Sequence, residues 1–374
     1  MTRYPKLALA AGVALLLLQQ GCTEVPDDGK RTDQGSASTA TQPPAAAAGE
    51  TAAADTPSPE RGESHTYGVQ AKGMAQSGVV VEPDQPSLPP IGASIPLTAE
   101  ELAAHQGEVD KLCSQIGNKL TSVNTKDCLD QLFRFGGGYS VQGRPLMFKD
   151  MIPARKQPKE FRVLLMGGVH GDEYSSISII FKWLQLFSPK ALEGEYHWRF
   201  APLVNPDGLL DGKQANRQNA NGVDLNRNFP SEDWNATAVG YWQDSTGSNP
   251  RRFPGSKAAS EPEVRWIVQQ MIDFRPDVIV SVHAPYHLLD FDGPREAPHK
   301  IGELYLHQLG VYPGSLGNYA GLNKAIPVVT LELPSAGIMP QAAEIKLMWS
   351  DLVSWLDSEG RKKMPDNNQT AQAR

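Results

Sequence analysis

The chain has 374 residues, with 35 lysine and arginine residues against 42 aspartate and glutamate residues, and a formal net charge of −7. This acidic balance argues against nucleic acid as a partner. The length suits one large globular domain with additional segments outside it.

The first 21 residues have the layout of a bacterial secretory signal, with a basic start and an apolar run over residues 7–18. This run is too short for a comfortable membrane span. Gly21-Cys22 resembles the lipobox of bacterial lipoproteins, although two glutamines precede it where that pattern has an aliphatic and a small residue. We therefore expect lipidation of Cys22 and a periplasmic protein anchored to the outer membrane, because Thr23 is not the aspartate that retains lipoproteins in the inner membrane. The alternative is a soluble periplasmic protein.

Two segments have compositions that cannot form a hydrophobic core. Residues 22–97 consist mainly of alanine, proline, serine, threonine, glutamine and glycine, and this composition predicts a disordered tether. A flexible coil of about 70 residues has an r.m.s. span of roughly 45–50 Å, so the tether would let a catalytic domain work away from a membrane anchor. Residues 361–374 are predicted to be a disordered tail.

Residues 98–135 are predicted to form a helical cap that contains a disulfide. Thr98 is a suitable N-cap, and apolar residues follow it at helical spacing as far as Leu112. Cys113 and Cys128 are expected to pair, because an even number of cysteines in an oxidising exported compartment most simply forms a disulfide. Neither has a cysteine or histidine at the spacing of a zinc finger, which argues against metal binding by this pair. Residues 139–149 have the pattern of a hairpin, with two extended runs around a turn at Gly143.

From residue 161 onward, strand-like and helix-like segments alternate. Apolar runs predict strands at residues 161–166, 196–204, 277–282 and 327–331. Helical periodicity and N-terminal capping signals predict helices at residues 175–186, 260–274 and 341–356. This alternation predicts an α/β sheet with helices on both faces, in which ligands bind at the carboxyl ends of the strands.

Metal-ligand residues follow two of these strands. His170 and Glu173 form an H-x-x-E pair just after the first strand, and His283 follows the third. The same spacing occurs at His105 and Glu108, but there it lies in a polar helical stretch with no strand before it. A catalytic zinc takes three nitrogen or oxygen ligands and keeps an open position for water. We therefore expect the first pair and His283 to form a zinc site.

Hydrolysis also needs a base and a group that stabilises the developing negative charge. Glu332 follows an otherwise apolar strand, where a buried carboxylate is costly unless it is paired or functional. It is the candidate base, and the alternative is a salt-bridged glutamate at a strand end. Arg217 and Arg227 lie in the long loop after Asn205, and guanidinium groups suit a carboxylate or a polarised carbonyl. An arginine in a loop is, however, most often only solvated.

Residues 136–357 resemble the zinc carboxypeptidase family, because five motifs occur in the order typical of that family. These motifs are His170-Gly-Asp-Glu173, Asn205-Pro-Asp-Gly208, Gly222-Val-Asp-Leu-Asn-Arg-Asn228, Ser281-Val-His283 and Thr330-Leu-Glu-Leu333. The resemblance implies a single-domain fold with a mixed, mostly parallel eight-stranded sheet and helices on both faces, here over residues 136–360. It also implies one catalytic zinc ion, bound by the two histidines and the glutamate named above.

The resemblance further implies a role for each polar residue of the site. Glu332 would be the general base and later the proton donor, and Arg217 would polarise the scissile carbonyl. Asn226 and Arg227 would bind the terminal carboxylate of the substrate. Arg217 lies only nine residues before Asn226, and this short spacing resembles the bacterial murein peptide amidase branch of the family rather than its digestive members.

One segment departs from the digestive members. These carry a mobile tyrosine where this chain has Gly310, with Tyr305 and Tyr312 on either side. Residues 312–318 instead resemble the substrate loop of the murein amidase branch, so Ser315 and Leu316 are expected to contact the substrate. The alternative for this segment is an ordinary turn at its Pro-Gly pair.

The expected export, the tether and the family branch together indicate a peptidoglycan stem peptide as the partner. The expected reaction is hydrolysis of the amide between D-glutamate and meso-diaminopimelate by a zinc-activated water. The alternatives are a general periplasmic carboxypeptidase and an N-acyl amino acid deacylase of the succinylglutamate desuccinylase type. A non-catalytic cell-wall-binding lipoprotein is a fourth possibility, against which the retention of Glu332 argues. We expect a monomer, with the membrane as a further partner through the lipid anchor.

Overall fold

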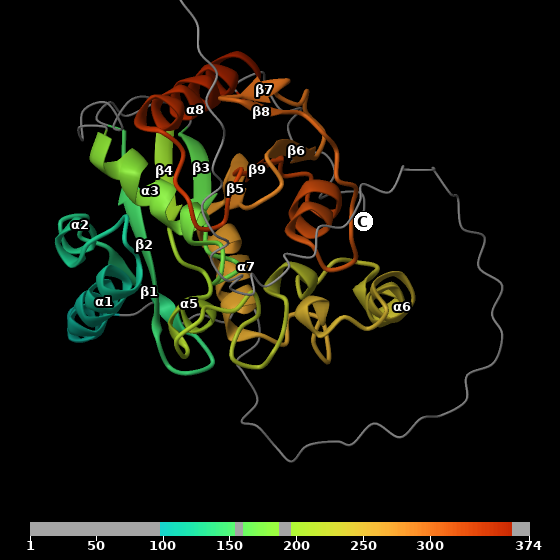
Figure 1. Ribbon diagram of the computed structural model, residues 1–374, viewed down its shortest axis with the longest axis horizontal. Coiled ribbons are helices and arrows are strands. Elements are labelled where there is room, and N and C mark those ends of the chain that lie inside the picture. The colour runs from blue at the N-terminus through green and yellow to red at the C-terminus, as the bar shows by residue number, and fades with distance from the viewer. Residues whose placement is uncertain (1–97, 154–159, 187–195, 361–374) are drawn as a thin grey trace, which may run out of the picture. The chain divides into compact units, whose positions relative to one another are not determined.

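The computed structural model describes residues 98–153, 160–186 and 196–360 (Figure 1). The predicted signal segment, the lipidation site Cys22, the tether and the C-terminal tail lie outside these residues. Among the helices that are described, none is both long enough and apolar enough to span a membrane.

The cap region contains two helices, α1 (Ala99–Lys119) and α2 (Thr125–Leu129). Thr98 and Glu101 form a capping box at the start of α1, in agreement with the N-cap predicted there. The helix runs seven residues beyond Leu112, because Ile116 continues its buried face. Cys113 and Cys128 are bonded and buried, which confirms the predicted disulfide.

The hairpin lies earlier in the chain than predicted. Its strands are β1 (Arg134–Tyr139) and β2 (Pro145–Met151), so the expected first run over residues 139–142 is wrong. Glycines at positions 136–138 obscured β1, since glycine is depleted in strands. The structure explains two of them: an added Cβ atom at Gly136 or Gly138 would lie 2.7 Å from the indole of Trp266. The close approach of this ring requires glycine.

The main sheet has seven strands in the described residues, in the order β1-β2-β4-β3-β5-β9-β6. Four neighbouring strands are mutually parallel: β4 (Tyr196–Ala201), β3 (Phe161–Met166), β5 (Val278–His283) and β9 (Val328–Glu332). Strand β6 (Leu288–Asp292) pairs with β9 antiparallel, and β2 pairs with both β1 and β4 antiparallel. The α/β class and the mixed sheet are as predicted, but the described residues form seven strands of it rather than the expected eight. Strands β7 (Lys300–Ile301) and β8 (Leu304–Tyr305) form a separate small sheet.

Helices cover both faces of the sheet (Figure 1). Alternate residues of β3 enter two cores: Val163 and Leu165 pack with α3 (Tyr174–Leu186) and α8 (Ala342–Trp355), whereas Leu164 and Met166 pack with α7 (Pro262–Phe274). Each fully buried aliphatic side chain contributes about 1.5–3 kcal/mol. The remaining helical segments are short or lie in the loops: α5 (Pro206–Leu210), η1 (Leu225–Arg227), α6 (Trp234–Thr246), η2 (Pro250–Arg252), η3 (Gly317–Asn323) and η4 (Leu356–Gly360).

The parallel arrangement brings distant residues to one edge of the sheet. His283 at the end of β5 is the register partner of Glu332 at the end of β9. Strand β3 lies on the other side of β5, and Met166 at its end pairs with Ser281. The chain after β3 therefore enters the same region as His283 and Glu332.

Candidate active site

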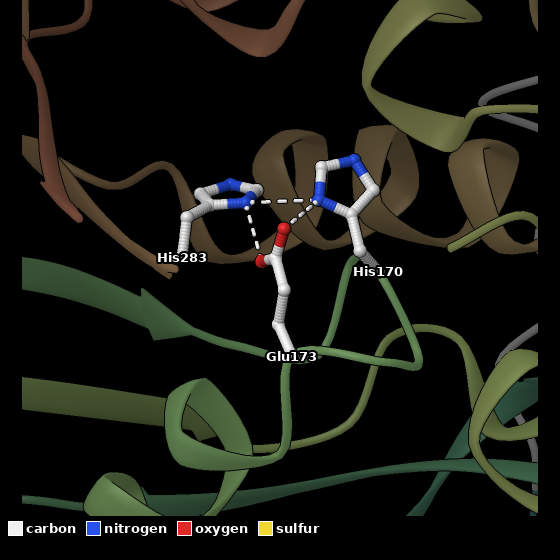
Figure 2. Close-up of side chains that lie close together, drawn as sticks. All are labelled: His170, Glu173 and His283. Carbon is white, nitrogen blue, oxygen red and sulfur yellow. Dashed lines mark hydrogen bonds and ion pairs between the residues drawn. The ribbon is translucent and has the colours of Figure 1, made fainter. Parts of the chain in front are cut away.

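His170, Glu173 and His283 converge at the carboxyl ends of β3 and β5 (Figure 2). Nδ1 of His170 lies 2.7 Å from Oε1 of Glu173, and Nδ1 of His283 lies 3.1 Å from Oε2 of the same carboxylate. The two Nδ1 atoms are 3.2 Å apart. All three side chains are buried. The structure thus brings together the three residues that the sequence predicted as metal ligands, although 113 positions separate the histidines.

The donor set fits a zinc ion. Two donors at about 2.0–2.1 Å from one zinc, at a tetrahedral angle, lie about 3.3 Å apart, which is close to the separations in this triad. Two imidazole nitrogens and one carboxylate are also the ligand types that catalytic zinc sites use. Among the described residues, this triad is the group of three or more histidine, cysteine or acidic side chains whose ligand atoms are close enough together to reach one ion. His105 and Glu108, which share the H-x-x-E spacing, lie instead on α1 and contact Tyr139.

Each histidine has a partner for its other ring nitrogen. Nε2 of His170 donates to Oδ1 of Asp224 at 3.0 Å, and Nε2 of His283 lies 3.0 Å from Oγ of Ser281. These contacts hold the rings with Nδ1 directed at Glu173, and such outer partners are typical of metal-binding histidines. Burial disfavours ionisation of Asp224, but the charges of Arg217 and His170 outweigh it and hold the pKa of this carboxyl well below its usual range.

Arg217 is placed beside the triad by Asp224. Its Nε donates to Oδ2 of Asp224 at 3.0 Å, and its Nη1 lies 3.5 Å from Oε1 of Glu173. The guanidinium is therefore adjacent to the predicted ligands, where it can stabilise negative charge on a substrate oxygen.

Glu332 is a buried carboxylate at the end of β9. The one hydrogen bond found for its side chain in the described residues is long, at 3.5 Å from the backbone N–H of Tyr286. Burial and the nearby charge of Glu173 raise the pKa of Glu332 to about 8. A buried carboxyl group beside the triad, with no strong hydrogen-bond partner in the described residues, is placed to accept and release a proton as a general base does.

Asn226 and Arg227 lie in the short helix η1. Oδ1 of Asn226 accepts a hydrogen bond from the N–H of Leu316 at 2.9 Å, which ties η1 to the segment before η3. The guanidinium of Arg227 stacks on the ring of Tyr312 at 4.5 Å and donates to the carbonyl of Asn226. Arg227 is buried.

Ser315 and Leu316, which were predicted to contact substrate, are both buried. The hydroxyl of Ser315 accepts from the N–H of Asn318 at 3.1 Å, and the side chain of Leu316 packs in the core beside α7. Any contact of Leu316 with substrate would therefore involve its backbone. Tyr305 is on β8 and is exposed, whereas Tyr312 lies under Arg227.

Sequence reasoning missed three residues beside the predicted ones. Asp224 lies inside the G-V-D-L-N-R-N motif, but the family resemblance implied roles only for Asn226 and Arg227 of that motif. Its place in the motif is the sequence signal that points to Asp224. Tyr286 has its backbone N–H next to Glu332. Arg251 forms an ion pair with Asp172, the residue that precedes the predicted ligand Glu173.

Comparisons with known proteins show what this chain is similar to. The model of the zinc carboxypeptidase family matches residues 126–291. Murein peptide amidase A of Escherichia coli (strain K12) is 30% identical over 230 residues, which cover 58% of this chain and 88% of the relative. Murein peptide amidase A of Vibrio campbellii is 30% identical over 206 residues, or 53% and 77% of the two chains. The crystal structure of a murein-tripeptide amidase from Escherichia coli O157 has a TM-score of 0.45 and 27% identity, covering 63% of this chain and 93% of that one.

An α/β sheet with a buried His-Glu-His triad at its strand ends defines a metallohydrolase. The chain belongs to the zinc carboxypeptidase family, and the resemblance found in the motifs is confirmed. It is therefore a hydrolytic metallopeptidase of a zinc-dependent family.

Proposed function

We propose that this enzyme hydrolyses the amide bond between D-glutamate and meso-diaminopimelate in peptidoglycan stem peptides, using one zinc ion held by His170, Glu173 and His283. The observation that carries the catalytic part is the convergence of these three buried side chains next to Glu332. The substrate rests on the two relatives named murein peptide amidase A, of which this chain covers 88% and 77%.

When bound, zinc would lower the pKa of a coordinated water to about 7 and polarise a carbonyl group. Glu332 then takes a proton from the attacking water and delivers it to the amine that leaves. Its position suits this exchange, because Glu332 ends β9 as the register partner of His283 and so lies beside the triad that would hold the zinc. Arg217 stabilises the negative charge that develops on the carbonyl oxygen.

Asn226 and Arg227 bind the carboxylate at the C-terminal side of the scissile bond. The guanidinium of Arg227 is held by Tyr312 and has no ion pair with an acidic side chain among the described residues. A buried cation of this kind favours an anionic ligand, because burial without a counter-charge is costly. A free terminal carboxylate, as in a peptide ending in diaminopimelate, provides that charge.

We also propose that the enzyme works in the periplasm, held at the outer membrane by a lipid on Cys22. The layout of the first 22 residues and the tether-like composition of residues 22–97 support this location. Mass spectrometry of the protein from membranes would show the added mass of acyl chains on an N-terminal Cys22. An unmodified protein in the soluble periplasmic fraction would contradict the anchor.

Product analysis tests the substrate. The purified enzyme, incubated with muropeptides that carry a tripeptide stem, should release free diaminopimelate, measured by mass spectrometry. A Glu332→Gln variant provides the inactive control. Cleavage of ordinary C-terminal peptides without release of diaminopimelate would reject the proposed substrate and support a general carboxypeptidase. Cleavage of N-acyl amino acids alone would support the deacylase.

A further inference from the structure

The short helix η2 carries two adjacent arginines, Arg251 and Arg252, and lies next to the loop that holds residues in contact with the metal triad. Its backbone is fastened to the loop that carries Arg217 and Asp224. The N–H of Asp224 donates to the carbonyl of Phe253 at 2.9 Å, and the side chain of Gln218 donates to the carbonyl of Pro250. The side chain of Asn249 caps the turn by accepting from the N–H of Arg251 at 3.0 Å. These bonds fix the position from which both side chains project.

An ion pair joins Arg251 to the segment that carries the triad residue Glu173. Its Nη2 donates to Oδ2 of Asp172 at 2.7 Å, and Asp172 lies in the chain directly before the ligand Glu173. The side chain of Arg251 is 55% exposed, and this is the one hydrogen bond of its guanidinium found in the described part of the chain. The remaining N–H groups are therefore available to a ligand.

Arg252 is half-buried and has no ion pair within the residues that the structure describes. It is near enough to Arg227 for the two charges to interact. Burial and the like charges of Arg217 and Arg252 lower the pKa of the Arg227 guanidinium. The negative charge of Asp224 acts in the other direction but does not outweigh them. Like-charged guanidinium groups near one another destabilise the free protein unless an anion joins them.

With zinc bound, the positive charges around the triad would exceed the negative ones, so that two anionic groups of a substrate could be bound. Four arginines lie in this region. Arg217 pairs with Asp224 and Arg251 pairs with Asp172. Arg227 and Arg252 have no ion pair with a carboxylate in the described ranges. Glu173 and Glu332, when both are ionised, would offset the charge of a divalent zinc ion. A peptide with one free carboxylate, at its C-terminus, would neutralise only one of the two unpaired arginines.

We propose that Arg251 and Arg252 form a second carboxylate subsite, which selects peptides that carry another carboxylate close to the scissile amide besides the terminal one. The ion pair with Asp172 orients the guanidinium of Arg251, and its free N–H groups and those of Arg252 bind the substrate. Arginine suits this task because its planar fork of donors matches a carboxylate.

This subsite rests on the proposed function and sharpens it. In a stem peptide that is linked through the γ-carboxyl of D-glutamate, the α-carboxyl group of that residue stays free on the acyl side of the scissile bond. Diaminopimelate carries a further carboxylate on its side chain. Either group could occupy the subsite, and the two sources can be separated by blocking one at a time.

The test measures kcat/KM for L-Ala-γ-D-Glu-meso-diaminopimelate and for two amidated analogues. One has the α-carboxyl of glutamate as an amide, and the other has the side-chain carboxyl of diaminopimelate as an amide. The wild-type enzyme should lose about 10- to 100-fold in kcat/KM on the analogue whose blocked group binds the subsite, as expected for lost charge-assisted hydrogen bonds. The double variant Arg251→Gln/Arg252→Gln should lose as much on the parent peptide and discriminate little against that analogue.

Arg275→Gln serves as the matched control, because Arg275 is exposed at the end of α7 that precedes β5, away from the carboxyl ends of the strands. Zinc content and melting temperature should be unchanged in all variants. Equal kcat/KM of the wild-type enzyme on the three peptides would overturn the subsite, as would unaltered discrimination in the double variant. Failure to cleave any of the three, with activity on ordinary peptides, would instead reject the proposed function. The subsite would then be tested with peptides carrying glutamate or glutamine before the scissile bond, and equal rates would overturn it.

Discussion

At the scale of single residues, Asp224 joins the separate parts of the site. Its carboxylate accepts from Nε2 of His170 and from Nε of Arg217, and it also accepts from the N–H of Asn226 at the start of η1. One buried side chain thus positions a predicted metal ligand, the arginine proposed to stabilise the oxyanion, and the turn that carries Asn226 and Arg227.

Asp224→Asn should weaken zinc binding by about 10- to 100-fold, the usual cost of losing a second partner of a metal-binding histidine. The amide keeps the shape of the carboxylate but loses its charge. Competition with a chelator of known affinity measures the change, and Asp273→Asn, on the exposed face of α7, is the control. Unchanged zinc affinity would show that His170 does not depend on this contact.

Glu332→Gln should strongly slow hydrolysis while the protein keeps its zinc, because Glu332 is outside the triad and its proposed task is proton transfer. A loss of about 10²–10⁴-fold in kcat is expected for a general base. Steady-state kinetics and metal analysis of the same preparation check both parts. Full activity of this variant would refute the proposed mechanism.

Asp292 provides a pH-dependent test of stability away from the triad. Burial and the charge of Asp290 raise the pKa of Asp292 to about 7, so the folded protein favours its protonated form. The stabilising contribution of this group is full below its unfolded pKa of about 3.9 and is lost as the pH rises through about 7. Asn at position 292 cannot ionise, so the stability of Asp292→Asn relative to the wild type should rise from about 0.5 kcal/mol at pH 4 to about 4 kcal/mol at pH 8.

Urea unfolding of both proteins across this pH range measures the difference. Asp273→Asn controls for the loss of an exposed charge. A constant difference between Asp292→Asn and wild type at all pH values would contradict the raised pKa.

At the scale of secondary structure, the elements with strong periodicity were predicted and the loops were not. Strands β3, β5 and β9 and helices α3, α7 and α8 lie within a few residues of their predicted positions. Strand β6 was missed because its five residues include two aspartates. Helix α6 was missed because only Trp234 and Ala238 in it are buried, so its sequence has little apolar periodicity.

The disulfide in the cap should stabilise the fold without serving catalysis. Cys113 and Cys128 are 15 positions apart, and closing a loop of that length contributes about 3 kcal/mol by restricting the unfolded chain. A thiol reductant should lower the unfolding free energy by about this amount and leave activity intact below the melting transition. The Cys113→Ala/Cys128→Ala variant should show no effect of reductant. An equal effect on the variant would mean that the reductant acts elsewhere.

At the scale of the whole molecule, the metal triad links two distant parts of the chain. His170 and Glu173 follow β3, and His283 ends β5, so a bound ion would hold these two neighbouring strands together. An ion that binds the folded state but not the unfolded state stabilises the folded protein by mass action.

Zinc removal should therefore lower thermal stability as well as activity. At free zinc about 1,000 times above Kd, the expected stabilisation is about 4 kcal/mol, so the melting temperature should fall by several degrees when a chelator is added. Calorimetry with and without chelator measures the shift. His283→Ala should melt at the same temperature in both conditions, and a chelator effect that persists in this variant would place the metal elsewhere.

The sequence by itself determined the α/β class, the family and the residues of the triad, because these depend on local patterns: apolar strands followed by motif residues. It could not determine the number of strands, the position of β1 or the contacts of Asp224 and Arg251. Those depend on side chains that are far apart in the chain, such as Trp266 against the glycines of β1 and Asp172 beside Arg251. Local periodicity depends only on residues that are close in the sequence, so it does not predict such pairs. Only the tertiary structure shows which distant residues come into contact.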